Sequence, residues 1–153
     1  GYFNSIGGTA LKVGSVKVNT VNLARIALDS NNEQEYLELL KERVTIALQA
    51  LDCVRHIIQR NVEKGLLPNF SNGLVDFEHL YNTVGFIGIY ETMKKFGYIG
   101  TDEFGNKFYT DEGIEFADKI FNVLNDDSFS ANANTVFPSI AMEVPKISLE
   151  DSK

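Results

Sequence analysis

The strongest structural signal in the chain lies in residues 31–64, NNEQEYLELLKERVTIALQALDCVRHIIQRNVEK. Apolar residues recur there at alternating spacings of three and four, which predicts an amphipathic helix over about residues 32–64. One of the two asparagines at its start, Asn31 or Asn32, is suited to cap the first turn, and glutamates follow where the helix dipole favours negative charge. Gly65 marks the expected end of the helix.

Two apolar stripes run along this predicted helix. The first is Leu37, Leu40, Val44, Ala47, Leu51, Val54 and Ile58, and the second is Leu39, Ile46, Ala50, Cys53 and Ile57. Together they are wider than the face that a helix buries against a single neighbour, so we expect cover on two sides. A helix of about 30 residues is also about 45 Å long, which exceeds the diameter of a small domain. The helix is therefore expected to belong to a larger structure.

A strand is predicted before this helix, at about residues 13–23, because valine and threonine dominate the segment. Apolar residues fall on both of its faces, which fits the wall of a barrel or a covered sheet. Asn22 shares a face with Val18 and Thr20 and needs a partner there. Two interpretations stay open for Asn22: a brace of the strand-to-helix turn, or a ligand contact at the strand's carboxyl end.

Further elements follow the long helix. A second helix is predicted at about residues 76–95, since apolar residues recur at helical spacing, and glycines inside it indicate close approach by another backbone or a ligand. A short hairpin or an irregular loop is expected at residues 98–109, and a third helix at about 111–124, capped by Thr110. A polar stretch, residues 126–153, completes an α/β chain that is mainly helical with one or a few strands.

Composition narrows the possible functions. The 153 residues carry a net charge of −7, which argues against a general nucleic-acid binder. No apolar run approaches the roughly 20 residues of a membrane-spanning helix. With one cysteine and two histidines, no metal motif or nucleophile–base pair can be assembled. Cys53 is expected to be a small buried hydrophobe, and the setting to be reducing and cytoplasmic.

Two segments resemble the anaerobic (class III) ribonucleoside-triphosphate reductases. Residues 14–27, GSVKVNTVNLARIA, are similar to a strand-to-helix segment of that family, with Ala24 in place of its usual proline. Residues 81–91, YNTVGFIGIYE, resemble a second family motif. The long helix and residues 110–124 are also similar to family segments, so the resemblance covers about residues 5–125.

The resemblance implies a glycyl-radical enzyme with a ten-stranded α/β barrel that reduces ribonucleoside triphosphates to deoxyribonucleotides. Residues 1–153 would form a single internal fragment of that barrel, with the thiyl cysteine just upstream of Gly1. The glycyl radical, the zinc site and the ATP and dNTP effector sites are expected outside this chain, which would hold no catalytic residue and bind no cofactor or metal. Ser15 and Asn22 are the candidate substrate contacts.

The implied partners are the rest of the reductase subunit, a radical-generating activase and a nucleotide substrate, with no nucleic acid and no membrane. The exposed apolar surface of a barrel fragment also suggests self-association. A different function stays open: a stand-alone helical module in which the wide apolar face of the long helix docks a protein partner. On the first interpretation the isolated chain is expected to be inactive.

Overall fold

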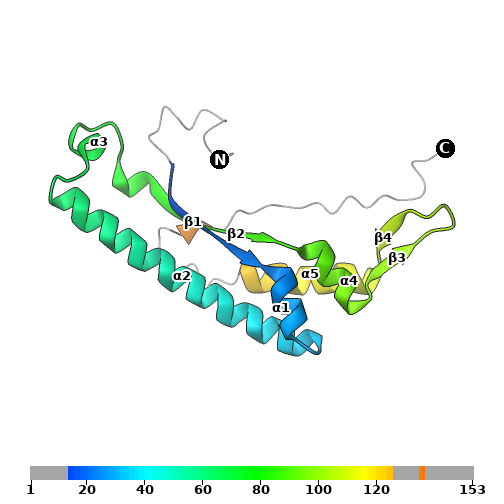
Figure 1. The fold of residues 1–153 in the computed structure, drawn as a ribbon. Helices are drawn as coiled ribbons and strands as arrows, with labels where there is room; N and C mark the ends of the chain where they lie inside the picture. Colours follow the sequence, from blue (N-terminus) through cyan, green and yellow to red (C-terminus); the bar gives the residue numbers. More distant parts are fainter. Residues whose placement is uncertain (1–13, 126–134, 137–153) are drawn as a thin grey trace.

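The computed structural model describes residues 14–125 and 135–136. The described part is mainly helical with a few strands, as expected. Its elements are β1 (Gly14–Asn22), α1 (Leu23–Asp29), α2 (Glu33–Glu63), α3 (Pro68–Ser71), a 3₁₀ turn (Phe77–His79), β2 (Leu80–Ile87), α4 (Ile89–Phe96), β3 (Ile99–Thr101), β4 (Lys107–Tyr109), α5 (Asp111–Leu124) and β5 (Thr135–Val136) (Figure 1).

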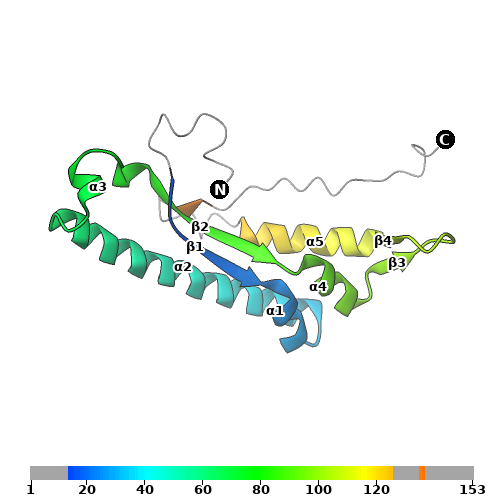
Figure 2. The same ribbon diagram turned by 45° about the horizontal axis from the view of Figure 1, so that its top comes forward.

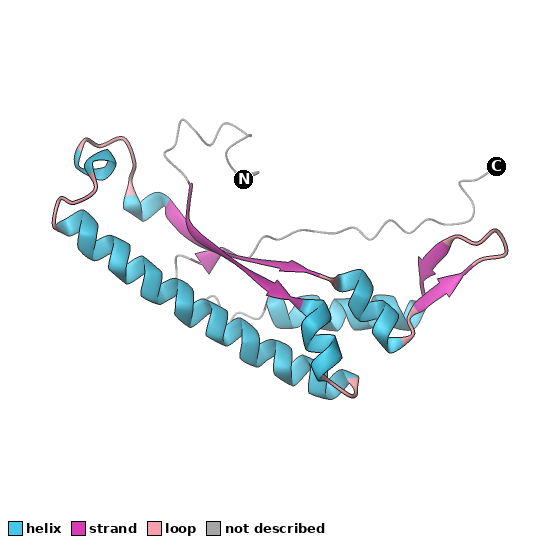
Figure 3. Ribbon diagram, in the orientation of Figure 1, coloured by secondary structure: helices cyan, strands magenta, loops and turns pink. Residues whose placement is uncertain are grey.

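Three strands form a parallel sheet in the order β1-β2-β5. The two long strands, β1 and β2, run side by side through the centre of the molecule (Figure 3). Val18 pairs with Thr83, and Asn22 pairs with Ile87, so both strands end at the same edge of the sheet. The register shifts once, between Ser15 and Lys17. The predicted strand at residues 13–23 is confirmed over Gly14–Asn22.

The long helix α2 forms as predicted and runs beneath the two long strands in the view of Figure 2, and α5 packs against α2. Asn32 is its cap, since the side-chain oxygen accepts a hydrogen bond of 2.9 Å from the Glu35 N–H. Its buried residues share one face: Tyr36, Leu40, Val44, Ala47, Leu48 and Leu51. Tyr36 makes edge contacts with Phe96 and Phe116, which joins α2 to α4 and α5. The core of the described structure therefore lies between α2, α5 and the sheet.

Most of the second apolar stripe of α2 is exposed, although Leu39 is half-buried against the core. Ile46 and Ile57 are 48% and 50% exposed, and Cys53 is exposed as well. The expectation that Cys53 is buried is therefore wrong for this structure. The reason is that β1, β2 and α5 pack on the side of α2 that carries its first stripe, and no described element covers Cys53.

The predicted helix at residues 76–95 is wrong. The structure has a 3₁₀ turn at Phe77–His79, the strand β2 at Leu80–Ile87 and only then the helix α4. Aromatic and β-branched residues fill β2, and such residues fit a pleated, half-buried surface. Their spacing also matches a helix, so pairing with β1, which is 60 or more residues away in sequence, decides between the two.

The hairpin and the last helix are confirmed. β3 and β4 pair antiparallel, and the Asp102 carboxylate accepts hydrogen bonds from the backbone N–H groups of Phe104 and Asn106. The Thr110 hydroxyl accepts from the Gly113 N–H at 3.2 Å and so caps α5. Within the polar stretch 126–153, only Thr135–Val136 is described, as β5, and the rest of that stretch lies outside the described residues.

Candidate functional site at the carboxyl ends of β1 and β2

The carboxyl ends of β1 and β2 meet where their backbones pass into α1 and α4. Gly88 separates β2 from α4 with a left-handed φ of +89°. A Cβ atom at this position would lie 2.8 Å from the Ala24 Cβ and 2.9 Å from the Ala24 nitrogen. Glycine therefore allows the two strand ends to approach closely, as the sequence pattern indicated, although at a strand end rather than inside a helix. Ligands in open α/β sheets bind at this type of edge.

The two faces of the sheet differ in their cover. Asn82 and Val84 of β2 are buried on the face that α2 and α5 cover. The alternate positions point to the opposite face, where Val18 and Ile87 are 51% and 57% exposed. No described helix packs on this second side, which we call the open face. It carries polar groups from both strands next to these apolar ones.

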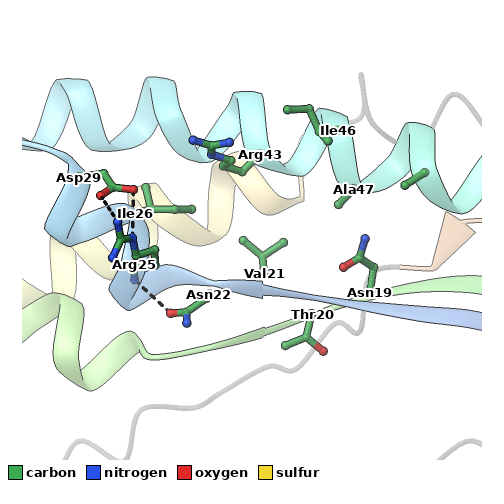
Figure 4. A pocket seen from close by; sticks show the side chains of 11 residues that line it. Asn19, Thr20, Val21, Asn22, Arg25, Ile26, Asp29, Arg43, Ile46 and Ala47 are labelled. Atoms are coloured by element: carbon green, nitrogen blue, oxygen red, sulfur yellow. Dashed lines mark hydrogen bonds and ion pairs between the residues drawn. The ribbon is translucent and has the colours of Figure 1, made fainter.

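Asn22 has a structural role that the sequence left open. Its side-chain oxygen accepts a hydrogen bond of 3.0 Å from the Arg25 N–H and caps α1 (Figure 4). That bond fixes the orientation of the amide, since an N–H donor requires the oxygen. No described residue accepts a hydrogen bond from the Asn22 Nδ2 group. An exposed amide donor therefore remains available at the strand end.

Ser15 lies at the other end of β1. Its hydroxyl is 3.1 Å from the Thr83 hydroxyl and donates to the Lys17 carbonyl at 3.3 Å. Asn22 lies seven positions after Ser15 along the strand, a distance of roughly 23 Å at about 3.3 Å per residue. The structure therefore does not bring the two candidate residues together. Thr83, which the sequence did not single out, is the side chain that Ser15 contacts.

A pocket of about 460 Å³ opens beside β1 on the helix-covered side (Figure 4). Val21, Ile26 and Ala47 contribute apolar surface, and two arginines contribute charge. Arg25 forms an ion pair of 3.3 Å with Asp29, its neighbour on α1. The lining comes from β1, α1 and α2, so the pocket lies at the edge of β1 that faces away from β2.

The described residues contain no group of three or more His, Cys, Asp or Glu side chains that could hold a metal ion. His56, one of the two histidines, hydrogen-bonds through Nδ1 to the Asp52 backbone carbonyl at 2.8 Å within its own helix. None of the helices in the described ranges is both long enough and apolar enough to cross a membrane. The open face, the two strand ends and the pocket beside β1 are the features of the described part that are suited to bind a ligand.

Comparison with known proteins gives the family. The model of the anaerobic ribonucleoside-triphosphate reductase family matches residues 3–146. Parallel strands with helices packed on one face are typical of α/β proteins. Within that class, the chain belongs to the anaerobic ribonucleoside-triphosphate reductase family. No curated protein matches it significantly.

Solved structures of the anaerobic ribonucleotide reductase from Thermotoga maritima are similar to the chain. The complex with dATP and CTP has a TM-score of 0.74 and 35% sequence identity, over 82% of this chain and 21% of that chain. The structure with citrate in the active site has the same TM-score and 33% identity, over 85% of this chain and 25% of that chain. The chain therefore spans about a fifth to a quarter of the length of these reductases.

Proposed function

We propose that the chain is an internal part of the catalytic subunit of an anaerobic ribonucleoside-triphosphate reductase. In this proposal β1 and β2 are neighbouring strands in the wall of a ten-stranded α/β barrel, with the open face toward its interior. The observation that carries the proposal is the parallel β1–β2 pair, which within the described ranges has helices on one face only and lies inside the family match over residues 3–146. Barrel walls require this one-sided helical cover.

The proposed reaction is the reduction of ribonucleoside triphosphates to deoxyribonucleotides by glycyl and thiyl radical chemistry. Cys53 does not fit the thiyl position, because it is exposed on α2, which packs on the side of the sheet opposite the open face. We assign the glycyl radical, the zinc and the ATP and dNTP effectors to parts of the subunit outside this chain.

Asn22 is the proposed substrate contact on β1. Its oxygen is committed to the Arg25 N–H, so the Nδ2 group is the part that would donate to a hydroxyl or phosphate oxygen of a nucleotide. Ser15 and Thr83 add a pair of hydroxyl groups near the other end of the strand. They would hydrogen-bond to a different part of the ligand, or to a neighbouring side chain of the barrel.

Replacing Asn22 by aspartate in the full-length subunit separates binding from capping. Aspartate keeps the acceptor for the Arg25 N–H but removes the amide donor and adds negative charge near a triphosphate. We expect Asn22→Asp to leave the melting temperature unchanged. Turnover should fall at least about tenfold, which corresponds to a loss of about 1.4 kcal/mol of transition-state stabilisation. The measurements are thermal unfolding and nucleotide reduction after activation.

Asn22→Ala serves as the companion variant in the same assays. It loses the cap as well, so we expect an additional fall in stability of about 1 kcal/mol. If Asn22→Asp retains full turnover and Asn22→Ala loses only stability, then Asn22 is a cap and nothing more.

The remaining assignments follow from the proposed reaction. The partners would be the rest of the subunit, a radical-generating activase and the nucleotide. We place the enzyme in the cytoplasm, because thiol radical chemistry needs reduced cysteines and that compartment keeps them reduced. The alternative, a stand-alone helical interaction module, is not favoured, since the family match includes the strands as well as the long helix.

A further inference from the structure

Gly85 lies inside the strand β2, where glycine weakens a strand and marks a bulge, a bend or close approach by another backbone or a ligand. The pairing of Gly85 with Thr20 is regular, since the register shifts only between Ser15 and Lys17. The φ of Gly85 is not positive. A Cβ atom at Gly85 would have one neighbour within 4 Å, the Thr20 Oγ1 at 3.5 Å, which is ordinary van der Waals contact. Among these reasons for glycine, close approach by a ligand remains.

Gly85 belongs to the open face of the sheet. Figure 4 shows the Thr20 side chain pointing away from α2, whereas Asn19 and Val21 point toward it. Residues that pair across parallel strands project on the same side, so Gly85 shares the open face with Thr20. The sheet therefore presents bare backbone directly beside the exposed Thr20 hydroxyl.

The side chains around this bare position are uncharged. Hydroxyl and amide groups alternate there with apolar groups: Ser15, Val18, Thr20 and Asn22 on β1, and Tyr81, Thr83 and Ile87 on β2. The one residue of the two strands with a charged side chain, Lys17, pairs with the buried Asn82 and so belongs to the helix-covered side. The open face of β1 and β2 thus offers hydrogen bonds and apolar contact without charge.

This chemistry suits the sugar and base of a nucleotide better than its phosphates. A triphosphate is strongly anionic, and proteins bind it with arginine, lysine or the free N–H groups at a helix start. The side chains of the open face include no cation. Ribose hydroxyls and base edges instead match hydroxyl and amide groups beside apolar surface, and a position without a side chain lets a ring approach the backbone closely.

We propose that the ribose and base of the substrate pack directly over Gly85, beside Thr20, and that the triphosphate lies off this face. Gly85 is then a substrate contact through its backbone, and a side chain at this position would take up volume that the substrate needs. The inference rests on the proposed function and deepens it, because it names the part of the nucleotide that the β1–β2 wall contacts.

Gly85→Ala in the full-length subunit separates this role from a structural one. The methyl group fits beside Thr20 and replaces a flexible residue, so the melting temperature should stay the same or rise. The KM for the ribonucleoside triphosphate should rise at least about fivefold, because a methyl group inserted into a close contact is unfavourable. Gly85→Val should raise the KM further. The yield of glycyl radical, measured by electron paramagnetic resonance, should match wild type in both variants.

Gly105→Ala is the control, with the opposite pattern expected. Gly105 lies between β3 and β4 with a φ of +84°, and its Cβ would meet nothing within 4 Å. Alanine there should lower the melting temperature through backbone strain and leave the KM unchanged. The two glycine substitutions thus distinguish a lost substrate contact from a general loss of stability.

Inhibition by nucleotides with fewer phosphates identifies the part of the ligand that Gly85 contacts. Gly85→Ala should weaken the ribonucleoside diphosphate and monophosphate, as competitive inhibitors, by the same factor by which it raises the KM. If that factor disappears as phosphates are removed, the phosphates lie over Gly85 and the proposal is wrong.

Two further results would overturn the inference alone. One is an unchanged KM in a Gly85→Ala subunit that reduces nucleotides. The other is a lowered melting temperature of Gly85→Ala, because a protein segment rather than the substrate would then fill the space over Gly85. If the wild-type subunit carries its glycyl radical and reduces no nucleotide, the proposed function fails and this inference fails with it.

Discussion

Replacing Gly88 by alanine is expected to lower the free energy of unfolding by about 3 kcal/mol. Two costs add: a left-handed backbone costs an L-residue about 1 kcal/mol, and inserting a methyl group into a filled space costs about 1–3 kcal/mol. The φ of Gly88 is +89°, and the new methyl group would lie 2.8 Å from the Ala24 Cβ. Backbone atoms of Ala24 are equally close, so rotation of a side chain cannot relieve the contact.

Gly105→Ala is the matched control for this substitution. Gly105 has a similar φ of +84°, but nothing lies within 4 Å of the position that its Cβ would take. Only the backbone cost of about 1 kcal/mol should appear there. Denaturant unfolding of both variants measures the difference. Equal losses at the two positions would mean that the β1 and β2 ends do not approach as closely as the structure shows.

Removing the Tyr98 hydroxyl is expected to destabilise the chain by about 2 kcal/mol, the usual range for a hydrogen bond to a charged group. The hydroxyl donates a hydrogen bond to the Glu33 carboxylate. The same carboxylate accepts a hydrogen bond of 3.2 Å from the Lys119 ammonium. Tyr98→Phe keeps the ring and its contacts with Phe96 and Phe116. The loss therefore measures the hydrogen bond that ties the start of α2 to the start of β3.

The difference in the free energy of unfolding between wild type and Tyr98→Phe should decrease at low pH and at high pH. The hydrogen bond from Tyr98 holds the pKa of Glu33 below its ordinary value, and the same bond raises the pKa of Tyr98 to about 12. The lowered Glu33 pKa adds stability that is lost as the pH falls through the folded pKa. The raised Tyr98 pKa adds stability that is lost as the pH rises toward 12. The difference should thus be constant from about pH 5 to 9. A difference that persists in acid would contradict this account.

Local sequence patterns are sufficient to predict the elements that form through contacts between residues a few positions apart. The sequence predicts the long helix, a cap at Asn31 or Asn32, the Thr110 cap of α5, and a hairpin or irregular loop at residues 98–109, because caps and helical stripes involve residues a few positions apart. The strand β1 was also predicted, from its run of β-branched residues. The helix, its cap, the cap of α5 and the hairpin depend on no contact with a distant part of the chain, whereas β1 becomes part of a sheet by pairing with β2.

Features that depend on distant partners were not predictable in the same way. The segment Leu80–Ile87 has apolar spacing that suits a helix, and only its parallel pairing with β1 makes it a strand. Whether Cys53 is exposed depends likewise on which side of α2 packs against the sheet and α5. At the site, Asn22 could be identified as a strand-end residue, but its cap on Arg25 and the contact of Ser15 with Thr83 needed the structure.

We propose that residues 1–153 belong to a nucleotide-reducing subunit whose radical residues lie elsewhere in the polypeptide. The most direct measurement is anaerobic nucleotide reduction by the full-length subunit and by the 153-residue chain, each treated with activase, a reductant and ribonucleoside triphosphate. The account predicts deoxyribonucleotide product from the full-length subunit and none from the chain alone. Product from the isolated chain, or none from a full-length subunit whose glycyl radical is detected by electron paramagnetic resonance, would contradict it.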